Sequence, residues 1–288
     1  MKGIIIAAGY GTRFLPCTKT VPKEMFPLVD TPAIDLIVKE FEKSGIKDIL
    51  IVTSRRKKVL EDYFDREVEL ETLFTAEKAE SKLEKIKIRE GLNIYFTRQE
   101  KMSGTGHAIM ICKSFIGNDP FVIAYPDDIV FSETPLARQL MDVHEKTGES
   151  VLAVQSVTGD VSRYGVIDYT EQQKKGSTLC QVNSIVEKPP RGTEPSHMIS
   201  IGRYLFTPEL LKLLEENYRN HSGGEFYHID SINQLAASGK MYALPYSGKR
   251  IDVGDKLGYL EGIIEYALTR DDLKEDTKKL LKKYSGLV

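Results

Sequence analysis

Short, continuous apolar runs alternate with segments of helical spacing along the first half of the chain. The runs that predict buried strands span residues 4–6, 49–52, 92–97 and 121–125. Residues 32–44 lie between the first two runs, carry apolar side chains at intervals of three and four, and end at Gly45, which is typical of a helix. Strand, helix and strand in this order form a βαβ unit, so we predict an α/β protein with a Rossmann-like, mainly parallel sheet flanked by helices.

The apolar pattern changes after residue 150. Runs at 151–157, 165–169 and 179–186 predict strands that are joined by loops and not by helices. Such strands pair in an antiparallel manner, so we expect a small antiparallel lobe here. Further along, the spacing predicts helices at 208–217 and 228–237 and a strand at 241–245.

Two segments rich in charge and leucine stand outside this frame. Residues 59–90 predict two helices on the outside of the molecule, with a solvated face and a few buried apolar side chains. Residues 256–288 predict two amphipathic helices with Leu257, Leu260, Ile264 and Leu268 at helical spacing. Packing of this stripe onto the core and contact with a second subunit both explain it, and the pattern does not decide between them.

Composition and charge narrow the class of protein. The chain has 288 residues, of which 41% are hydrophobic and 28% charged, as in an ordinary globular protein. A net charge of -2 argues against nucleic acid as a partner, and no apolar run approaches the ~20 residues of a membrane span. The three cysteines are far apart and form no disulfide or zinc pattern, so we expect a cytoplasmic protein.

The first predicted strand leads into Ala7-Ala8-Gly9-Tyr10-Gly11-Thr12-Arg13, with Lys23 and Glu24 downstream. Glycines bring backbone N–H groups close to a ligand, and guanidinium and ammonium groups bind phosphate oxygens. The spacing matches neither a Walker A loop nor a dinucleotide fingerprint. We therefore predict a phosphate site built from loop amides, Arg13 and Lys23, the alternative being a turn with solvated cations.

Polar residues follow the later strands too. Gln99 and Gly104 lie in a loop whose amide groups suit a base edge, and we expect His107 beside them to form structural hydrogen bonds. Asp127 leaves the fourth strand where α/β sheets place metal ligands, and one carboxylate plus substrate phosphates is how Mg²⁺ is usually held. Asp252 is a candidate second ligand. The alternative, an Asp-rich turn, applies more strongly to Asp128, which could cap a helix or loop.

A set of motifs in a fixed order resembles the sugar-1-phosphate nucleotidyltransferase family. The motifs are Ala7-Ala8-Gly9-x-Gly11-Thr12-Arg13, Pro22-Lys23-Glu24-Met25, Arg98-Gln99, Gly104-x-Gly106-His107-Ala108, Asp127-Asp128, Tyr164-Gly165-Val166-Ile167, Glu187-Lys188-Pro189, Gly202-Arg203-Tyr204 and Lys256-Leu257-Gly258-Tyr259. Together they span nearly the whole chain. The second and fourth motifs look like the uridylyl branch of the family, the bacterial UTP–glucose-1-phosphate uridylyltransferases. Residues 225–230 depart from the family's pattern.

The resemblance implies that UTP and glucose 1-phosphate give UDP-glucose and pyrophosphate with Mg²⁺ as cofactor. Catalytic roles are implied for Arg13, Lys23, Asp127 and Lys188, and metal binding for Asp127 and Asp252. Nucleotide-binding roles are implied for Ala8, Gly9, Gly11, Thr12, Glu24, Gln99, Gly104 and Asp128. Contacts with the sugar phosphate are implied for Gly165, Glu187, Lys188 and Gly202. For Glu187 and Lys188, a solvated surface ion pair is the alternative.

The resemblance also implies how the chain is divided. We expect a catalytic domain over residues 1–250, with nucleotide binding in 1–150 and sugar binding in 151–250. Residues 251–288 would form a helical segment and a possible contact in a homodimer or homotetramer. Two alternatives to this function remain: a related enzyme that uses dTTP or CTP, and a non-catalytic nucleotide-sugar sensor.

Overall fold

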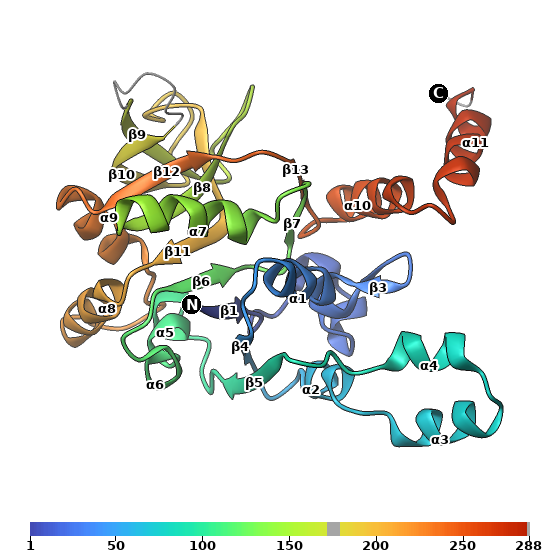
Figure 1. The fold of residues 1–288 in the computed structure, drawn as a ribbon. Coiled ribbons are helices and arrows are strands. Elements are labelled where there is room, and N and C mark those ends of the chain that lie inside the picture. The colour runs from blue at the N-terminus through green and yellow to red at the C-terminus, as the bar shows by residue number, and fades with distance from the viewer. Residues whose placement is uncertain (172–178, 287–288) are drawn as a thin grey trace.

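A mixed sheet of nine strands forms the centre of the computed structural model, which describes residues 1–171 and 179–286 (Figure 1). In spatial order the strands are β5 (Asn93–Arg98), β4 (Asp48–Thr53), β1 (Lys2–Ile6), β6 (Phe121–Ala124), β11 (Met198–Phe206), β8 (Ser150–Ser156), β12 (Met241–Pro245), β10 (Cys180–Glu187) and β9 (Gly165–Glu171). The strand runs predicted from the sequence are confirmed to within about two residues of their ends, as is usual for element boundaries.

The first four strands in that order form the parallel half. β1 pairs in parallel with β4 and β6, and β4 pairs in parallel with β5. Ile4 and Ile5 of β1 are fully buried because the strand has a neighbour on each side and a layer on each face. The carboxyl ends of β1, β4 and β6 therefore meet at one edge of the sheet, where α/β proteins bind ligands.

The other half is antiparallel apart from one pair. β11 pairs antiparallel with β6 and β8, β10 pairs antiparallel with β9 and β12, and β12 runs parallel to β8. The predicted antiparallel strands are confirmed, and they continue the same sheet. We did not predict β11, which lies at the centre of the sheet. Its Arg203 is fully buried, although arginine side chains are ordinarily exposed.

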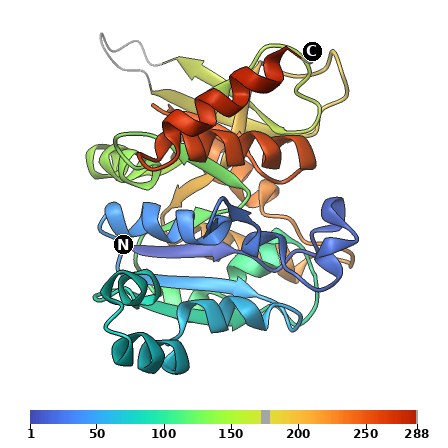
Figure 2. The same cartoon turned by 90° about the vertical axis from the view of Figure 1, so that its right-hand side faces the viewer.

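Helices cover both faces of the sheet, each over its own apolar cluster (Figures 1 and 2). One face carries α1 (Ala33–Lys43) and α7 (Leu136–Thr147). The opposite face carries α5 (Thr105–Met110), α6 (Lys113–Ile116), α8 (Glu209–Arg219) and α9 (Ile229–Ala237). The helices predicted at 32–44, 208–217 and 228–237 are thereby confirmed.

Two small ladders complete the strands. β2 (Pro27–Leu28) and β3 (Thr31–Pro32) form a hairpin near α1, and β7 (Asp128–Phe131) pairs antiparallel with β13 (Lys249–Asp252). The second ladder lies directly after β6 and directly before the C-terminal helices. It therefore carries residues from two distant parts of the chain to the ligand-binding edge of the sheet.

Two arms project from the body on the same side of the molecule (Figure 1). The hairpin arm consists of α3 (Val68–Ala76) and α4 (Glu80–Ile86), and it follows α2 (Lys58–Phe64). The C-terminal arm consists of α10 (Lys256–Thr269) and α11 (Lys274–Ser285). The prediction of two helices over 59–90 was wrong, since three form there. The helices predicted over 256–288 are confirmed as far as residue 286.

The leucine stripe of α10 does not pack onto the core. Leu257 is 76% exposed and Leu260 is 55% exposed. The helix α10 packs on β2 of the hairpin and on β13, and its buried residues are Gly262 and Ala267. Separately, none of the helices within the described residues combines the length and the apolar character needed to cross a membrane.

Candidate active site

The loop after β1 and the segment after β6 border an open cleft of ≈ 190 Å³. Its lining residues are Gly11, Thr12, Arg13, Phe14, Lys23, Asp127 and Gly254. Gly11 has φ 67°, a left-handed conformation that a residue with a Cβ rarely adopts, and its carbonyl oxygen accepts a hydrogen bond from Thr18 Oγ1 at 2.8 Å. The glycine loop therefore turns sharply where it borders the cleft.

Lys23 and Asp127 form an ion pair in this cleft. Lys23 Nζ lies 2.5 Å from Asp127 Oδ2, and the two side chains are 21% and 24% exposed. Burial by itself lowers the pKa of Lys23, but the Asp127 carboxylate outweighs it and raises that pKa above its usual value. Burial raises the pKa of Asp127, and Lys23 outweighs it in the opposite direction. Both groups are therefore charged at neutral pH.

Asp252 lies next to this pair. A Cβ on Gly254 would stand 2.8 Å from Asp127 Oδ2 and 2.8 Å from Asp252 Oδ1, so the two oxygens lie no more than twice that distance apart. Arg13 Nη1 donates to the Gly254 carbonyl oxygen at 3.4 Å from the other side. Gly254 therefore lies beside the carboxylates of Asp127 and Asp252 and close to the cations of Lys23 and Arg13.

This donor set fits Mg²⁺. No group of three or more His, Cys, Asp and Glu side chains in the described part of the chain is placed to hold a metal ion. Mg²⁺ does not require one, because it is usually held by one or two carboxylates, water and substrate phosphates. Asp127 and Asp252 would supply the carboxylates of such a site, beside the open cleft.

Asp128, for which a contact with nucleotide is predicted, makes its hydrogen bonds within the protein. Its Oδ1 accepts from Arg250 Nε at 2.5 Å and its Oδ2 accepts from the Gly202 amide at 3.0 Å. Both oxygens are thus engaged by the protein. Burial raises the pKa of Asp128 despite the neighbouring Arg250. Asp128 fixes the crossing of β7, β11 and β13 under the cleft.

Glu24, which is also predicted to lie at the nucleotide, is only 2% exposed. Its two carboxylate oxygens each lie 2.8 Å from Lys57 Nζ, which also donates to the Ala7 carbonyl oxygen at 2.5 Å. The pair ties the loop after β1 to the loop after β4. The sequence offered no signal for Lys57 beyond its place in a basic stretch after the second strand.

A second loop holds Gln99 and Gly104 together. Gln99 Nε2 lies 2.9 Å from the Gly104 carbonyl oxygen, to which it donates, and 3.2 Å from His107 Nδ1. The structural hydrogen bond predicted for His107 is therefore confirmed. Gly104 has φ 91°, and a Cβ there would lie 2.4 Å from the Phe226 carbonyl oxygen. Only glycine fits this close approach.

The segment that departs from the family's pattern supports this loop. The Phe226 amide donates to the Ser103 carbonyl oxygen at 2.8 Å, and the Gly106 amide donates to that of Phe226 at 2.9 Å. His228 Nδ1 lies 2.7 Å from Thr105 Oγ1. Residues 226–228 therefore clamp the loop at 103–106, a role that the sequence pattern did not reveal.

The residues expected to meet a sugar phosphate lie at the start of β9, at the end of β10 and just after it, and in the middle of β11. Gly165 pairs with Glu187 across the ladder, and a Cβ on Gly165 would lie 3.0 Å from Glu187 Oε2. A Cβ on Gly202 would lie 2.5 Å from Asp128 Oδ2. Lys188 Nζ is 3.5 Å from Glu187 Oε1, and the Lys188 side chain is 64% exposed. In this structure, Glu187 and Lys188 form a surface ion pair beside Gly165 and Gly202, and their contact with a sugar phosphate remains a prediction.

Arg203 is the largest buried charge that the sequence left unassigned. It is fully buried and donates from Nε and Nη2 to the two carboxylate oxygens of Glu40, at 2.9 and 2.8 Å. It also donates to the carbonyl oxygens of Gly202 and Asp128. Arg203 therefore anchors the backbone around the cleft to α1.

This site is typical of a nucleotidyltransferase. It combines a phosphate-type loop after the first strand with a lysine that pairs with a carboxylate just after a central strand. Residues 2–268 match a family model described as nucleotidyl transferase. A UTP–glucose-1-phosphate uridylyltransferase of Staphylococcus epidermidis is 46% identical over 98% of this chain and 97% of its own length.

Solved structures agree with this relation. A UTP-bound enzyme of this type from Acinetobacter baumannii has 33% identity and a TM-score of 0.88, covering 97% of this chain and 98% of the other. A UDP-glucose pyrophosphorylase complexed with UDP-glucose has 36% identity and a TM-score of 0.80, covering 93% and 99%. The chain therefore belongs to the nucleotidyl transferase family and, within it, to the UTP–glucose-1-phosphate uridylyltransferases.

Proposed function

We propose that this protein transfers the uridylyl group of UTP to glucose 1-phosphate, which gives UDP-glucose and pyrophosphate. The observation that carries the proposal is the meeting of Lys23 and Asp127 beside the glycine loop, 104 residues apart in the chain. The staphylococcal relative supports the choice of substrates through its identity over nearly the whole chain.

The reaction needs charge neutralisation more than it needs a base. The second pKa of a phosphate ester lies near ~6, so the sugar phosphate is mostly a dianion at neutral pH and attacks without losing a proton. The barrier comes from bringing this dianion to the α-phosphorus of the negatively charged triphosphate. Catalysis then rests on positioning and on opposing the negative charge, as in phosphoryl transfer generally.

The cleft supplies cations for this purpose. Lys23 is kept charged by Asp127, and Arg13 is held over the same cleft by the Gly254 carbonyl oxygen. We assign these two side chains to the β- and γ-phosphates and so to the departing pyrophosphate. Lys188 is assigned to the incoming sugar phosphate, with Glu187, Gly165 and Gly202 around the sugar.

Asp127 and Asp252 would hold Mg²⁺ against the triphosphate. The ion supplies further positive charge to phosphate oxygens when it is bound. Before that, Lys23 satisfies Asp127, so the ammonium group is already oriented toward the place where phosphates enter. Ala8, Gly9, Gln99 and Gly104 are assigned to the uracil and the nucleoside, and the Glu24–Lys57 pair holds the loop that carries Ala8 and Gly9.

A panel of substrates tests the proposal. Pyrophosphate release is measured with UTP, dTTP and CTP, each combined with glucose 1-phosphate and galactose 1-phosphate, with Mg²⁺ and after addition of EDTA. We expect the fastest turnover with UTP and glucose 1-phosphate and its loss with EDTA. Higher kcat/KM with dTTP or CTP would assign the protein to another branch, and binding of UDP-glucose without turnover on any pair would make it a sensor.

A further inference from the structure

The segment that joins α8 to α9 connects parts of the proposed site that come from distant strands. Its Phe226 and His228 hold the loop at 103–106, to which the nucleoside is assigned. The ring of His228 also lies 6.4 Å from the ring of Tyr125, directly after β6. Residues 225–230 are where the chain departs from the family's pattern, so the family motifs assign no role to the other side chains of this segment.

The same segment lies beside the end of β10, because α9 packs along β10 in the opposite direction. Gln181 Nε2 donates to the Gly239 carbonyl oxygen at 2.8 Å. Further along the strand, Asn233 exchanges two hydrogen bonds with the backbone of Ile185, at 2.7 and 3.1 Å. Two more residues of strand and four more of helix each advance by about 6 Å. Glu187, the last residue of β10, therefore lies beside the residues that begin α9.

Tyr227 points away from the anchored side of this segment. Phe226 and His228 on either side of it are 4% and 7% exposed, whereas Tyr227 is 54% exposed. The Tyr227 hydroxyl group donates to Glu225 Oε2. This hydrogen bond raises the pKa of Tyr227, and the Glu187 carboxylate adds to the rise. Tyr227 is therefore neutral at physiological pH and lies within electrostatic reach of Glu187.

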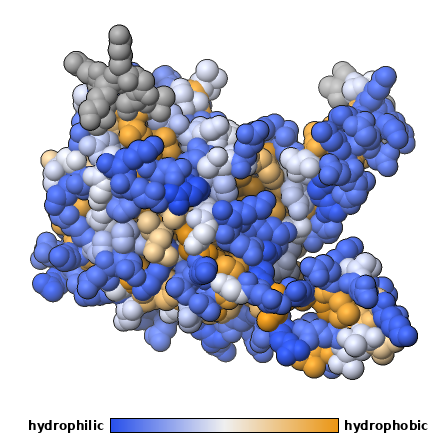
Figure 3. Space-filling view, viewed as in Figure 1, coloured by the Kyte–Doolittle hydropathy of each residue, from blue (hydrophilic) through white to orange (hydrophobic). Residues whose placement is uncertain are grey.

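Tyr227 does not belong to an apolar surface. Across residues 190–250, all of which the structure describes, Tyr218 and Tyr227 are the only large apolar side chains that are exposed. Figure 3 shows apolar side chains on the hairpin arm instead, at the other end of the molecule. A phenol between two carboxylates suits a ligand that carries hydroxyl groups, because each of these groups accepts hydrogen bonds.

We propose that Tyr227 binds a hydroxyl group of the sugar and that Glu225 positions it. The inference rests on the proposed function, since it adds a contact to the sugar phosphate that is assigned to Lys188 and Glu187. A phenolic oxygen donates one hydrogen bond and accepts another. The proton of Tyr227 goes to Glu225, so the phenolic oxygen is left to accept from a hydroxyl group of the glucose unit.

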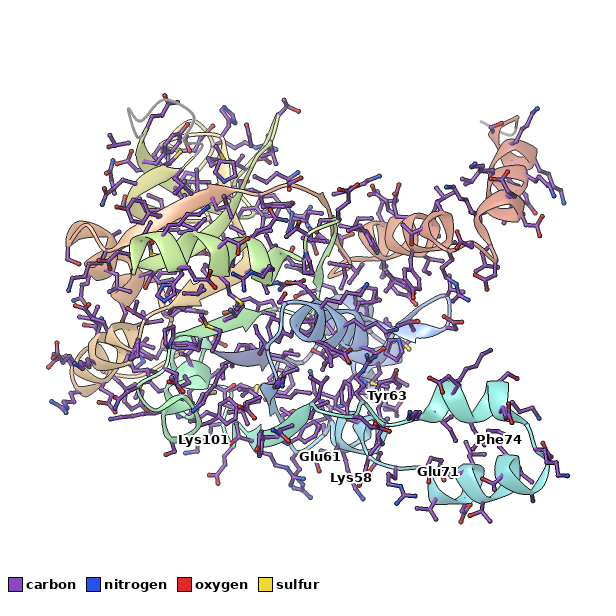
Figure 4. All side chains as sticks on the ribbon, viewed as in Figure 1. Lys58, Glu61, Tyr63, Glu71, Phe74 and Lys101 are labelled. Carbon is purple, nitrogen blue, oxygen red and sulfur yellow. The ribbon has the colours of Figure 1, made fainter. Side chains whose placement is uncertain are left out.

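Removing the hydroxyl group of Tyr227 tests the contact. Tyr227→Phe should raise the KM for glucose 1-phosphate roughly tenfold, as expected for one hydrogen bond, and leave the KM for UTP within about twofold of wild type. The matched control is Tyr63→Phe. Burial and the nearby Asp35 carboxylate raise the pKa of Tyr63, so this tyrosine also lies near a carboxylate, but it belongs to α2, far from α9 (Figure 4). The control should leave both KM values unchanged.

Variants of Glu225 test the positioning. Glu225→Ala releases the Tyr227 hydroxyl group and should raise the KM for glucose 1-phosphate about as much as Tyr227→Phe does. The double variant should be little worse than either single one, because both changes remove the same contact. Glu225→Gln should restore the wild-type KM, because its amide oxygen also accepts from Tyr227. A merely structural effect of the substitutions would not show this lack of additivity together with this rescue.

Altered substrates identify the hydroxyl group that Tyr227 binds. Analogues of glucose 1-phosphate that each lack one hydroxyl group are compared in wild type and in Tyr227→Phe. For one analogue, we expect kcat/KM to fall roughly tenfold in wild type and less than about twofold in the variant, since the variant has already lost the partner of that group.

Three results would overturn the inference. They are a KM for glucose 1-phosphate in Tyr227→Phe within about twofold of wild type, an equal rise in the KM for UTP, and the same relative loss for every analogue in wild type and variant. Circular dichroism verifies that each variant is folded.

Failure of the proposed function gives a different result, namely a wild type without turnover. Calorimetry with UDP and UDP-glucose then measures the contribution of the sugar without a reaction. Tyr227→Phe should raise the Kd of UDP-glucose roughly tenfold and leave the Kd of UDP unchanged. An unchanged Kd of UDP-glucose would overturn the role of Tyr227 whether or not the protein is an enzyme.

Discussion

Replacing Lys23 by alanine tests the charge arrangement in the cleft most directly. The change removes the ammonium group 2.5 Å from Asp127 Oδ2 and leaves Arg13 as the remaining cation beside the triphosphate site. Two unit charges about 4 Å apart interact by about 4 kcal/mol at an effective dielectric constant near 20. Loss of one preorganised donor to a transition state usually lowers kcat by about 10²–10³, which agrees with that estimate.

We therefore expect Lys23→Ala to lower kcat for pyrophosphate release by about 10²–10³. The matched control is Lys23→Arg, which keeps the charge and should retain more activity than alanine. Both variants should stay folded in urea titrations. The destabilisation should be smaller than the roughly 3–5 kcal/mol of a fully buried pair, because both partners are partly exposed. A kcat for Lys23→Ala within about threefold of wild type would refute the role given to this lysine.

Three further predictions follow from the same geometry. Asp252→Asn should raise the Mg²⁺ concentration needed for half-maximal activity, while Asp255→Asn, the neighbouring helix-cap variant, should not; equal Mg²⁺ dependence in both would remove Asp252 from the metal site. Arg203→Met should lower the free energy of unfolding by about 3–5 kcal/mol because it leaves Glu40 buried and unpaired, and adding Glu40→Gln should recover part of that loss in urea titrations. Burial lowers the pKa of His228 from its usual value to about 4, so between pH 6.5 and 4 the unfolded chain binds more protons and stability falls as pH falls. Between pH 7.5 and 5, protonation of His228 in the unfolded chain should lower the free energy of unfolding by about 2 kcal/mol. This pH dependence should be absent in His228→Gln.

Local apolar patterns were enough to predict most elements of the sheet. β1, β4 and β6 are runs of buried aliphatic residues, and α1 has its apolar side chains on one face, so each can be recognised within a short window. The same patterns did not predict β11. It is buried on both faces yet contains Arg203, and a single charge in a run breaks the pattern even where a distant carboxylate neutralises it.

The loop motifs led to the prediction of a phosphate site, and the residues predicted for it line one cleft. Gly11, Arg13, Lys23 and Asp127 line it together because β1 and β6 are neighbours in the sheet. For Glu24 and Asp128, the sequence did not reveal the cations Lys57 and Arg250 that pair with them in the structure. A carboxylate in a binding motif looks the same in sequence whether it faces a ligand or a buried cation.

By itself, the sequence determined the class of fold, the family motifs and the position of the cleft, because these depend on residues close together in the chain. Tertiary structure decided which charges are paired and which apolar stripes stay exposed. Lys57 meets Glu24 across 33 residues, Arg250 meets Asp128 across 122, and Arg203 meets Glu40 across 163. Such pairs depend on which strands become neighbours, and so does the exposure of Leu257 and Leu260 on α10.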